Sequence, residues 1–177
     1  MKRFSDFLVS LILIFIFLPV MIIISIIIKL DSKGPIIYAS YRIGKGGKPF
    51  RYFKFRSMYV GSEKVTRFGI FIRRWHLDEL PELFLVLTGH MSLVGPRPWP
   101  TVKRNHKAYY ESLRVKPGMT GPAQINRHKE NTIENVIILN HWYADNSGFL
   151  TDAQIIIKTP LAIMQQKEGV TETVTII

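Results

Sequence analysis

The pattern of apolar and polar positions divides the chain at about residue 30. Residues 7–28 carry no charged side chain, and only Ser10, Pro19 and Ser25 interrupt the run of large apolar residues. A straight helix of this length measures ~33 Å at ~1.5 Å per residue, which matches the roughly 30 Å hydrocarbon core of a bilayer. No small-residue cleavage site follows the run, so we expect a retained membrane helix rather than a signal peptide.

Pro19 lies near the middle of this segment and predicts a break or kink, because proline lacks a backbone donor and clashes with the preceding turn. Two arrangements remain open on these grounds. One is a kinked helix that spans the bilayer, and the other is a helix-break-helix that re-enters and returns to the same face. Basic residues flank both ends of the segment, so the positive-inside rule does not decide between them.

The next part of the chain predicts a β-hairpin. Residues 36–43 and 50–56 are short runs rich in β-branched and aromatic residues, and the segment between them contains only glycine, lysine and proline. In the second run the alternation places Phe53 and Phe55 on one face, and Tyr52, Lys54 and Arg56 on the other. We therefore expect one packed face and one basic face.

Helical patterns dominate the remainder. We expect helices over residues 66–75, 80–87, 103–113, 132–143 and 151–165, the last kinked near Pro160, with a loop over 94–100 and a turn over 117–121. The pattern contains no internal repeat and no second domain boundary. It predicts a helix-dominated α+β fold, in which a membrane segment over residues 1–30 and a domain over residues 31–177 form one structural unit.

The amino-acid composition narrows the classes of molecule that the protein could bind. The net charge is +11, from 24 Lys and Arg against 13 Asp and Glu, and this favours anionic partners such as lipid headgroups, nucleotides or nucleic acid. Because basic residues flank the apolar segment, we expect anionic membrane lipids first and no nucleic acid. The chain has no cysteine, which excludes disulfides, thiolate nucleophiles and cysteine-held metal sites.

Residues 73–83 (RRWHLDELPEL) are the most informative for chemistry. Asp78 and Glu79 precede an apolar helix, where they would complement its dipole. The same pair would also suit Mg²⁺ and phosphoryl chemistry. Magnesium prefers one or two carboxylates together with substrate phosphates, and a carboxylate can attack phosphorus. Nearby Arg73 would offset charge on phosphate oxygens.

Three further segments carry candidate binding residues, each with a simpler structural interpretation. Prolines on both sides stiffen the backbone at Arg97, which suits a phosphate contact or a tight turn. Lys54 and Arg56 share a strand face and would contact lipid headgroups or a substrate phosphate. Residues 116–124, which include Thr120 and Gln124, combine glycines with a hydroxyl, either for a close approach to a ligand or simply for a loop.

In order and spacing these segments resemble the bacterial sugar transferase family, the monotopic phosphoglycosyl transferases that act on undecaprenyl phosphate. The likeness covers about residues 2–165. It rests on residues 54–58 (KFRSM), 77–81 (LDELP), 91–98 (MSLVGPRP), 117–121 (PGMTG) and 123–124 (AQ). The length is similar to that of minimal members, which consist of the catalytic domain.

The resemblance implies a fold and a reaction. It implies a re-entrant helix broken at Pro19, amphipathic helices at the interface, and a domain on the cytoplasmic face of the bacterial inner membrane. Both ends of the membrane segment would then be cytoplasmic. It also implies that Asp78 attacks the sugar-bearing phosphate of a UDP-sugar and releases UMP, and that undecaprenyl phosphate then takes the phosphosugar. Glu79 would bind Mg²⁺ with Asp78, and Arg73 and Arg97 would bind phosphate.

The chain departs from the family pattern in several places. Leu18 replaces a frequent Ser before Pro19, Ser40 replaces a Gln, Glu82 replaces a Gln beside the carboxylate pair, and Pro122 replaces a Trp. Residues 126–128 lack a usual Gly. No residue here indicates a particular sugar. Three other interpretations stay open: a membrane protein that binds anions without catalysis, a phosphatase that uses water as acceptor, and a non-catalytic scaffold.

Overall fold

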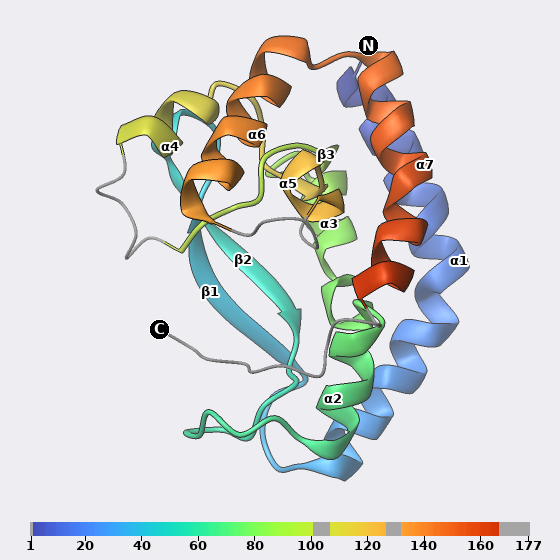
Figure 1. Cartoon of the computed structure of the whole chain (residues 1–177). Coiled ribbons are helices and arrows are strands. Elements are labelled where there is room, and N and C mark those ends of the chain that lie inside the picture. Colours follow the sequence, from blue (N-terminus) through green and yellow to red (C-terminus); the bar gives the residue numbers. More distant parts are fainter. Residues whose placement is uncertain (1, 101–106, 127–131, 167–177) are drawn as a thin grey trace.

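The computed structural model describes residues 2–100, 107–126 and 132–166, and it confirms a helix-dominated α+β fold (Figure 1). The helices are α1 (Lys2–Asp31), α2 (Arg67–Arg74), α3 (Glu82–Leu87), α4 (Lys107–Ser112), α5 (Pro122–Ile125), α6 (Ile133–Asn146) and α7 (Phe149–Gln166). Two 3₁₀ turns, η1 (Lys45–Gly47) and η2 (Leu77–Glu79), and the strands β1 (Ile37–Ile43), β2 (Pro49–Phe55), β3 (Ser92–Val94) and β4 (Gly118–Thr120) complete the described elements. Residues 103–106 of one predicted helix, and residues 127–128, lie outside the described ranges.

The N-terminal helix corrects the prediction of a helix-break-helix. α1 continues through Pro19 as one helix of 30 residues along one edge of the molecule (Figure 1), and by length and composition it could cross a membrane. Proline removes only one helical hydrogen bond, and in an apolar segment the remaining backbone groups are best satisfied within the helix. Leu18 offers no hydroxyl that would pair with backbone groups freed by a break. α7 likewise contains Pro160 without interruption.

The predicted hairpin is confirmed. β1 and β2 pair antiparallel, with Ile37 opposite Phe55 and Ile43 opposite Pro49. Phe55 is buried, as expected, but so is Tyr52 on the other face, because α3 packs against β2. The prediction of one packed and one basic face was therefore wrong for this strand, because the face of Tyr52 and Lys54 is the more covered one and the other face is exposed at Pro49 and Arg51.

A second, two-stranded sheet was not predicted. β4 pairs parallel with β3, so residues 118–120, expected within a turn, form a strand instead. Gly95 and Gly118 permit this pairing, since a Cβ added to Gly118 would lie 2.0 Å from the Gly95 nitrogen. Strands of three residues that contain glycine have no recognisable alternation, which explains why the sequence pattern missed them.

The core connects the membrane-length helix to the hairpin. α3 lies between α1 and β2, and one cluster of buried residues joins the second half of α1 to β2 and α2, namely Met21, Ile24, Ile28, Phe55 and Ile72. Complete burial of one such side chain contributes about 1.5–3 kcal/mol. The opposite side of α1 exposes large apolar side chains, among them Phe15 and Ile16.

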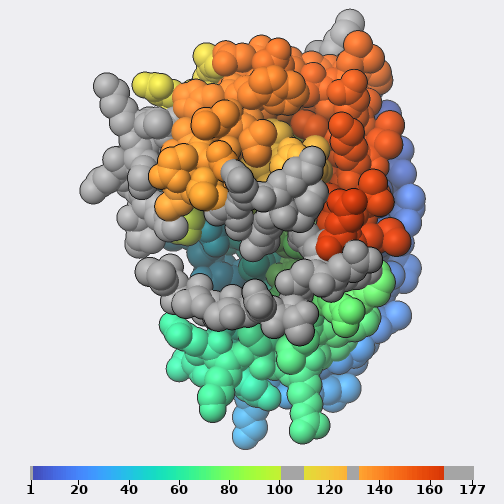
Figure 2. All heavy atoms as spheres, in the orientation of Figure 1, coloured from blue at the N-terminus to red at the C-terminus, as the bar shows by residue number. Residues whose placement is uncertain are grey.

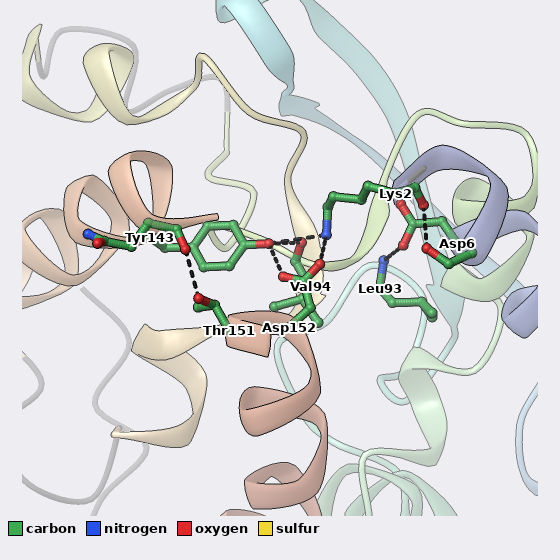
Figure 3. A network of polar contacts seen from close by, with 9 residues as sticks. Lys2, Asp6, Leu93, Val94, Tyr143, Thr151 and Asp152 are labelled. Atoms are coloured by element: carbon green, nitrogen blue, oxygen red, sulfur yellow. Dashed lines mark hydrogen bonds and ion pairs between the residues drawn. The ribbon is translucent and has the colours of Figure 1, made fainter. Parts of the chain in front are cut away.

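The first turns of α1 make polar contacts with the domain (Figure 3). Lys2 donates to the Tyr143 hydroxyl at 3.2 Å and pairs with Asp152, while the backbone N–H of Leu93 donates to Asp6 at 3.2 Å. The Tyr143 hydroxyl lies 2.9 Å from the carbonyl oxygen of Val94. We call Lys2, Asp6, Tyr143 and Asp152 the N-terminal latch, because they join the beginning of α1 to β3, α6 and α7.

Candidate active site

The Asp78–Glu79 pair lies in η2, between α2 and α3. Thr66 caps α2 by accepting from the Gly69 N–H, and the helix ends in two arginines, as favoured by the helix dipole. His76 then adopts φ 54°, a left-handed conformation that is costly for a residue with a Cβ. Asp78 and Glu79 form the 3₁₀ turn before α3, and Pro81 holds the N-cap position of that helix without a side-chain hydrogen bond. The simple capping interpretation therefore does not describe them.

Asp78 is almost fully buried, with 3% of its surface exposed. Its Oδ2 lies 3.3 Å from the Nζ of Lys54, which reaches across from β2. Burial raises the pKa of the Asp78 carboxyl above its ordinary value, and the positive charge of Lys54 opposes that shift. Lys54 thus holds a buried carboxylate closer to its ionised form than burial alone would allow.

Glu79 has a different environment. Its Oε1 lies 3.5 Å from Arg97, and its Oε2 lies 3.5 Å from Nδ1 of His76. Burial alone would raise the pKa of Glu79, but the hydrogen bond from His76 and the charges of Arg97, His76 and Lys54 outweigh burial and lower it to about 2. Glu79 is consequently an ionised carboxylate across the physiological pH range.

A third carboxyl group, that of Glu82, lies in the first turn of α3. It is 2% exposed, and its Oε1 accepts a short hydrogen bond from the Tyr52 hydroxyl. Burial and the negative charge of Glu79 raise the pKa of Glu82 well above its ordinary value. A protonated Glu82 is neutral, so it resembles the glutamine that is common at this position in the family pattern.

Lys54, Glu79 and Glu82 border a small pocket, which we call the carboxylate pocket; Asp78 contacts it through Lys54 and is not itself among the lining residues. The pocket is lined by Arg42, Tyr52, Lys54, Glu79, Glu82, Arg97, Pro98, Gly118, Met119 and Gln124. An adjoining pocket is lined by His76, Glu79, Arg97, Thr120 and Gln124, together with apolar residues of α5 and α7. The structure therefore brings Glu79, Arg97, Thr120 and Gln124, all candidate residues from the sequence, to one pocket. The Thr120 hydroxyl also lies 2.7 Å from that of Thr159 on α7.

A larger cavity of about 690 Å³, which we call the hairpin cavity, lies beside the carboxylate pocket. Its lining includes Lys54, Arg42 and Arg73. Lys54 and Arg42 line both spaces, so these two side chains form the boundary between them. The space-filling view in Figure 2 shows one face of the molecule with a marked hollow, at whose floor atoms of the hairpin are visible.

Two predicted binding residues have other contacts. Arg73 donates from Nε to the Ser57 hydroxyl at 2.8 Å and lines the hairpin cavity, and it is not among the residues that line the carboxylate pocket. Arg56 is buried, and its guanidinium donates to the hydroxyl and carbonyl of Ser32 and to the carbonyl of Pro35. The structure thus assigns Arg56 to the C-terminal end of α1 and not to the carboxylate pocket.

The carboxylate oxygens of this site can be compared with the ligands that Mg²⁺ requires. Asp78 and Glu79 supply carboxylate oxygens, which are the hard ligands that Mg²⁺ prefers. Within the described ranges no group of three or more His, Cys, Asp or Glu residues could hold a metal ion. A pair of carboxylates fits the usual magnesium arrangement, in which substrate phosphates and water complete the coordination shell.

Comparison with known proteins now identifies the family. The model of the bacterial sugar transferase family matches residues 1–166 of this chain. The chain belongs to the bacterial sugar transferase family. The match extends from the first turn of α1 to the end of α7, so it includes the latch, the hairpin and the carboxylate pocket.

Several relatives have names that specify a sugar substrate. The UDP-glucose:undecaprenyl-phosphate glucose-1-phosphate transferase of Klebsiella pneumoniae is 40% identical over 157 residues, which is 76% of this chain and 33% of that protein. The UDP-N-acetylgalactosamine-undecaprenyl-phosphate N-acetylgalactosaminephosphotransferase of Aeromonas hydrophila is 36% identical, over 92% of this chain and 43% of that protein. The UDP-galactose-lipid carrier transferase of Erwinia amylovora is 32% identical, over 96% of this chain and 41% of that protein. The chain therefore spans less than half the length of these relatives.

Sequence reasoning missed several side chains of this bacterial sugar transferase site. His76 beside Glu79 and Tyr52 beside Glu82 were not proposed as site residues, and neither was Arg42. A signal existed for Tyr52, because strand alternation placed it on the same face as Lys54. His76 had no comparable signal, since its contact with Glu79 depends on a left-handed backbone turn.

Proposed function

We propose that this chain transfers a phosphosugar from a UDP-sugar to undecaprenyl phosphate, with Asp78 as the nucleophile. The observation that carries the proposal is the buried Asp78 carboxylate, 3.3 Å from the Lys54 ammonium and next to the Glu79–Arg97 pair. The activities of the relatives support the class of reaction, and their sugars differ from one another. The sugar used by this chain is therefore left open.

In the first step a carboxylate oxygen of Asp78 forms a bond to the sugar-bearing phosphorus. The bond between that phosphorus and the bridging oxygen breaks, and its electron pair leaves with UMP. Lys54 and Arg97 can offset the negative charge on the phosphate oxygens, as cations do in phosphoryl transfer. No proton has to be transferred in this step, which agrees with an ionised nucleophile between cations.

In the second step an oxygen of undecaprenyl phosphate attacks the same phosphorus and releases Asp78. The product is an undecaprenyl-diphosphate sugar, which would begin the assembly of a glycoconjugate such as a capsule, exopolysaccharide, O-antigen or glycoprotein. A covalent intermediate allows two dissimilar substrates to use one site in turn.

Asp78 and Glu79 would hold Mg²⁺ together with the substrate phosphates. The ion would supply positive charge that neutralises the diphosphate. Glu79 suits this role because Arg97 and His76 keep it ionised, whereas burial raises the pKa of Glu82, which serves as an acceptor for Tyr52.

We further propose that the domain lies on the cytoplasmic face of the inner membrane, with both ends of α1 on that face and with anionic lipids as neighbours. The latch binds the beginning of α1 to the domain, and Arg56 binds its end through Ser32. A helix that crossed the bilayer away from the domain would have to lose one of these sets of contacts.

The test is UMP release from a panel of UDP-sugars, with purified protein in detergent, Mg²⁺ and undecaprenyl phosphate. We expect one or a few sugars to react, and Asp78→Asn to reduce release by about a thousandfold or more, because the nucleophile is removed. Omission of Mg²⁺ should also abolish release.

Asp145→Asn is the matched control, since Asp145 is exposed and pairs only with Arg114 at the surface among the described contacts. It should retain the full rate. Folded protein that releases no UMP with any UDP-sugar, or an Asp78→Asn variant that keeps its rate, would contradict the proposal. UMP release that continues without undecaprenyl phosphate through many turnovers would indicate a hydrolase instead.

A further inference from the structure

Arg42, on β1, differs from the other cations of the site in having no acidic partner. Lys54 pairs with Asp78, and Arg97 pairs with Glu79. The guanidinium of Arg42 instead lies over the ring of Tyr52, 5.1 Å from its centroid. In the part of the chain that the structure describes, Arg42 forms no salt bridge, and its buried Nε has no hydrogen-bond partner.

An unpaired buried donor is costly and therefore needs an explanation. A buried N–H without an acceptor forfeits the hydrogen bond it made with water, and a guanidinium carries a full charge as well. Such a group is commonly satisfied by a ligand. The geometry of guanidinium donors matches phosphate oxygens, which accept two parallel hydrogen bonds from them.

The position of Arg42 agrees with such a ligand. Its side chain lines both the carboxylate pocket and the hairpin cavity, beside Lys54. The β1–β2 ladder fixes its backbone opposite Phe50, and a further bridge joins it to Pro100. The Tyr52 ring then supports the guanidinium plane. Of the two carboxyl groups that line this pocket, Glu79 pairs with Arg97 and Glu82 accepts from Tyr52, and neither forms a salt bridge with Arg42 in the described part of the chain.

We propose that Arg42 binds the phosphate that leaves as UMP, while Lys54 and Arg97 bind the phosphate attacked by Asp78. The inference rests on the proposed function. Lys54 and Arg97 contact the reacting carboxylates directly, so the sugar-bearing phosphorus belongs beside them. The neighbouring phosphate of a diphosphate is one bridging oxygen away, and Arg42 stands at the boundary through which that phosphate would extend into the hairpin cavity.

Arg42 would therefore act on the leaving group. When the bond between phosphorus and the bridging oxygen breaks, the electron pair stays on that oxygen, which becomes a terminal oxygen of UMP. Its negative charge increases by one in this step. A positioned guanidinium that donates to the same phosphate stabilises this charge as it develops.

The experiment compares UMP with uridine, because the two ligands differ only in the phosphate. Binding is measured by calorimetry in the Asp78→Asn background, with Mg²⁺ present, so that no turnover occurs. We expect Arg42→Met to weaken UMP binding about tenfold or more, which is the magnitude of hydrogen bonds to a charged group. Uridine binding should not change. The UMP affinity of Arg42→Lys should lie between that of the protein with Arg42 and that of Arg42→Met.

Arg51→Met is the matched control, because Arg51 is exposed on β2 of the same hairpin. It should leave the preference for UMP over uridine intact. Melting temperatures of all variants are measured in parallel. If Arg42→Met lowers the melting temperature while the ratio of UMP to uridine affinity stays at the wild-type value, then Arg42 merely supports the hairpin and the inference is wrong.

A second ligand, inorganic pyrophosphate, distinguishes failure of the phosphate site at Arg42 from failure of the proposed reaction. If the wild-type protein binds no UMP and uses no UDP-sugar, the proposed function fails, and the phosphate site is then tested with inorganic pyrophosphate alone. Pyrophosphate binding that weakens in Arg42→Met but not in Arg51→Met would support a phosphate site at Arg42. Equal binding in the two variants would overturn it.

Discussion

Asp78 and Glu79 are neighbours in the sequence, yet their side chains meet different partners. Among the described residues, Lys54 is the one cation within salt-bridge distance of Asp78, whereas both Arg97 and His76 approach Glu79. Burial therefore dominates the pKa of Asp78, and positive neighbours dominate that of Glu79. These surroundings suit the two roles that we propose, with Asp78 as the nucleophile and Glu79 as an ionised ligand for Mg²⁺.

The pH dependence of kcat/KM should reflect Asp78 rather than Glu79. The proposed mechanism requires ionised Asp78, so activity should fall as the pH drops through the raised pKa of that carboxyl. Lys54→Met removes the positive charge that favours ionisation, and it should move this acid limb to higher pH and lower the maximal rate. The measurement is UMP release against pH. Lys48→Met, exposed on the same hairpin, should leave the profile unchanged, and an acid limb at the same pH in Lys54→Met would contradict this assignment.

Glu82→Gln should stabilise the protein at neutral pH. The folded-state pKa of Glu82 is raised above its ordinary value of 4.5, so the folded state binds the proton more tightly than the unfolded state. Stability is therefore lost as pH rises from about the unfolded pKa through the folded one. Glutamine cannot ionise, and its carbonyl still accepts from Tyr52. Melting temperatures should favour Glu82→Gln increasingly as pH rises and converge near pH 4. A variant that melts lower at every pH would show that Glu82 acts as a charged group.

α1 illustrates how one element combines two environments. One side packs on α2, α3 and β2 through Met21, Ile24 and Ile28, while the other exposes large apolar side chains. Its ends are polar and are bound by the domain, and Arg56 donates to carbonyls at the C-terminal end, where the helix dipole favours a cation. The helix is thus part of the folded domain as well as a candidate membrane element.

The latch should contribute measurably to stability. Tyr143→Phe removes only a hydroxyl, but it leaves the carbonyl of Val94 and the carboxylate of Asp152 without that donor. An unsatisfied buried group costs about 1–3 kcal/mol, so we expect a clearly lower melting temperature. Hydrogen exchange of the peptide over residues 93–98 should also increase. Tyr41→Phe is the control, because Tyr41 is 63% exposed. Equal melting temperatures for the two variants would show that the Tyr143 hydroxyl of the latch does not stabilise the folded protein.

On the scale of the whole molecule, α1 determines how the site meets the membrane. Contacts at both of its ends belong to the same domain, and the carboxylate pocket lies on elements that pack against this helix. In the proposed reaction the lipid phosphate is presented at the membrane surface, so a domain held against that surface would receive it without extracting the polyprenyl chain. The packing of α1 would thus link membrane attachment to access of the proposed acceptor.

Cysteine labelling can test this arrangement directly, because the chain has no native cysteine. Ser5→Cys and Lys33→Cys place single thiols at exposed positions near the two ends of the membrane segment. In vesicles of one orientation, a membrane-impermeant maleimide should label both variants from the same side. Detergent-solubilised samples control for reactivity. Labelling from opposite sides would mean that α1 spans the bilayer and that the latch contacts are lost in the membrane.

Local patterns in the sequence were enough to predict the helices, the hairpin and the residue types available for chemistry. A long uncharged run forms a helix whatever surrounds it. Strand alternation predicted the hairpin, and the Asp78–Glu79 pair indicated carboxylate chemistry. Contacts between distant segments were decided only by the tertiary structure. The β3–β4 pairing, the burial of Arg56 against α1 and the stacking of Arg42 on Tyr52 all depend on packing that no local pattern encodes. The same packing distinguishes the two carboxylates, since a pKa depends on burial and on charges brought from elsewhere in the chain.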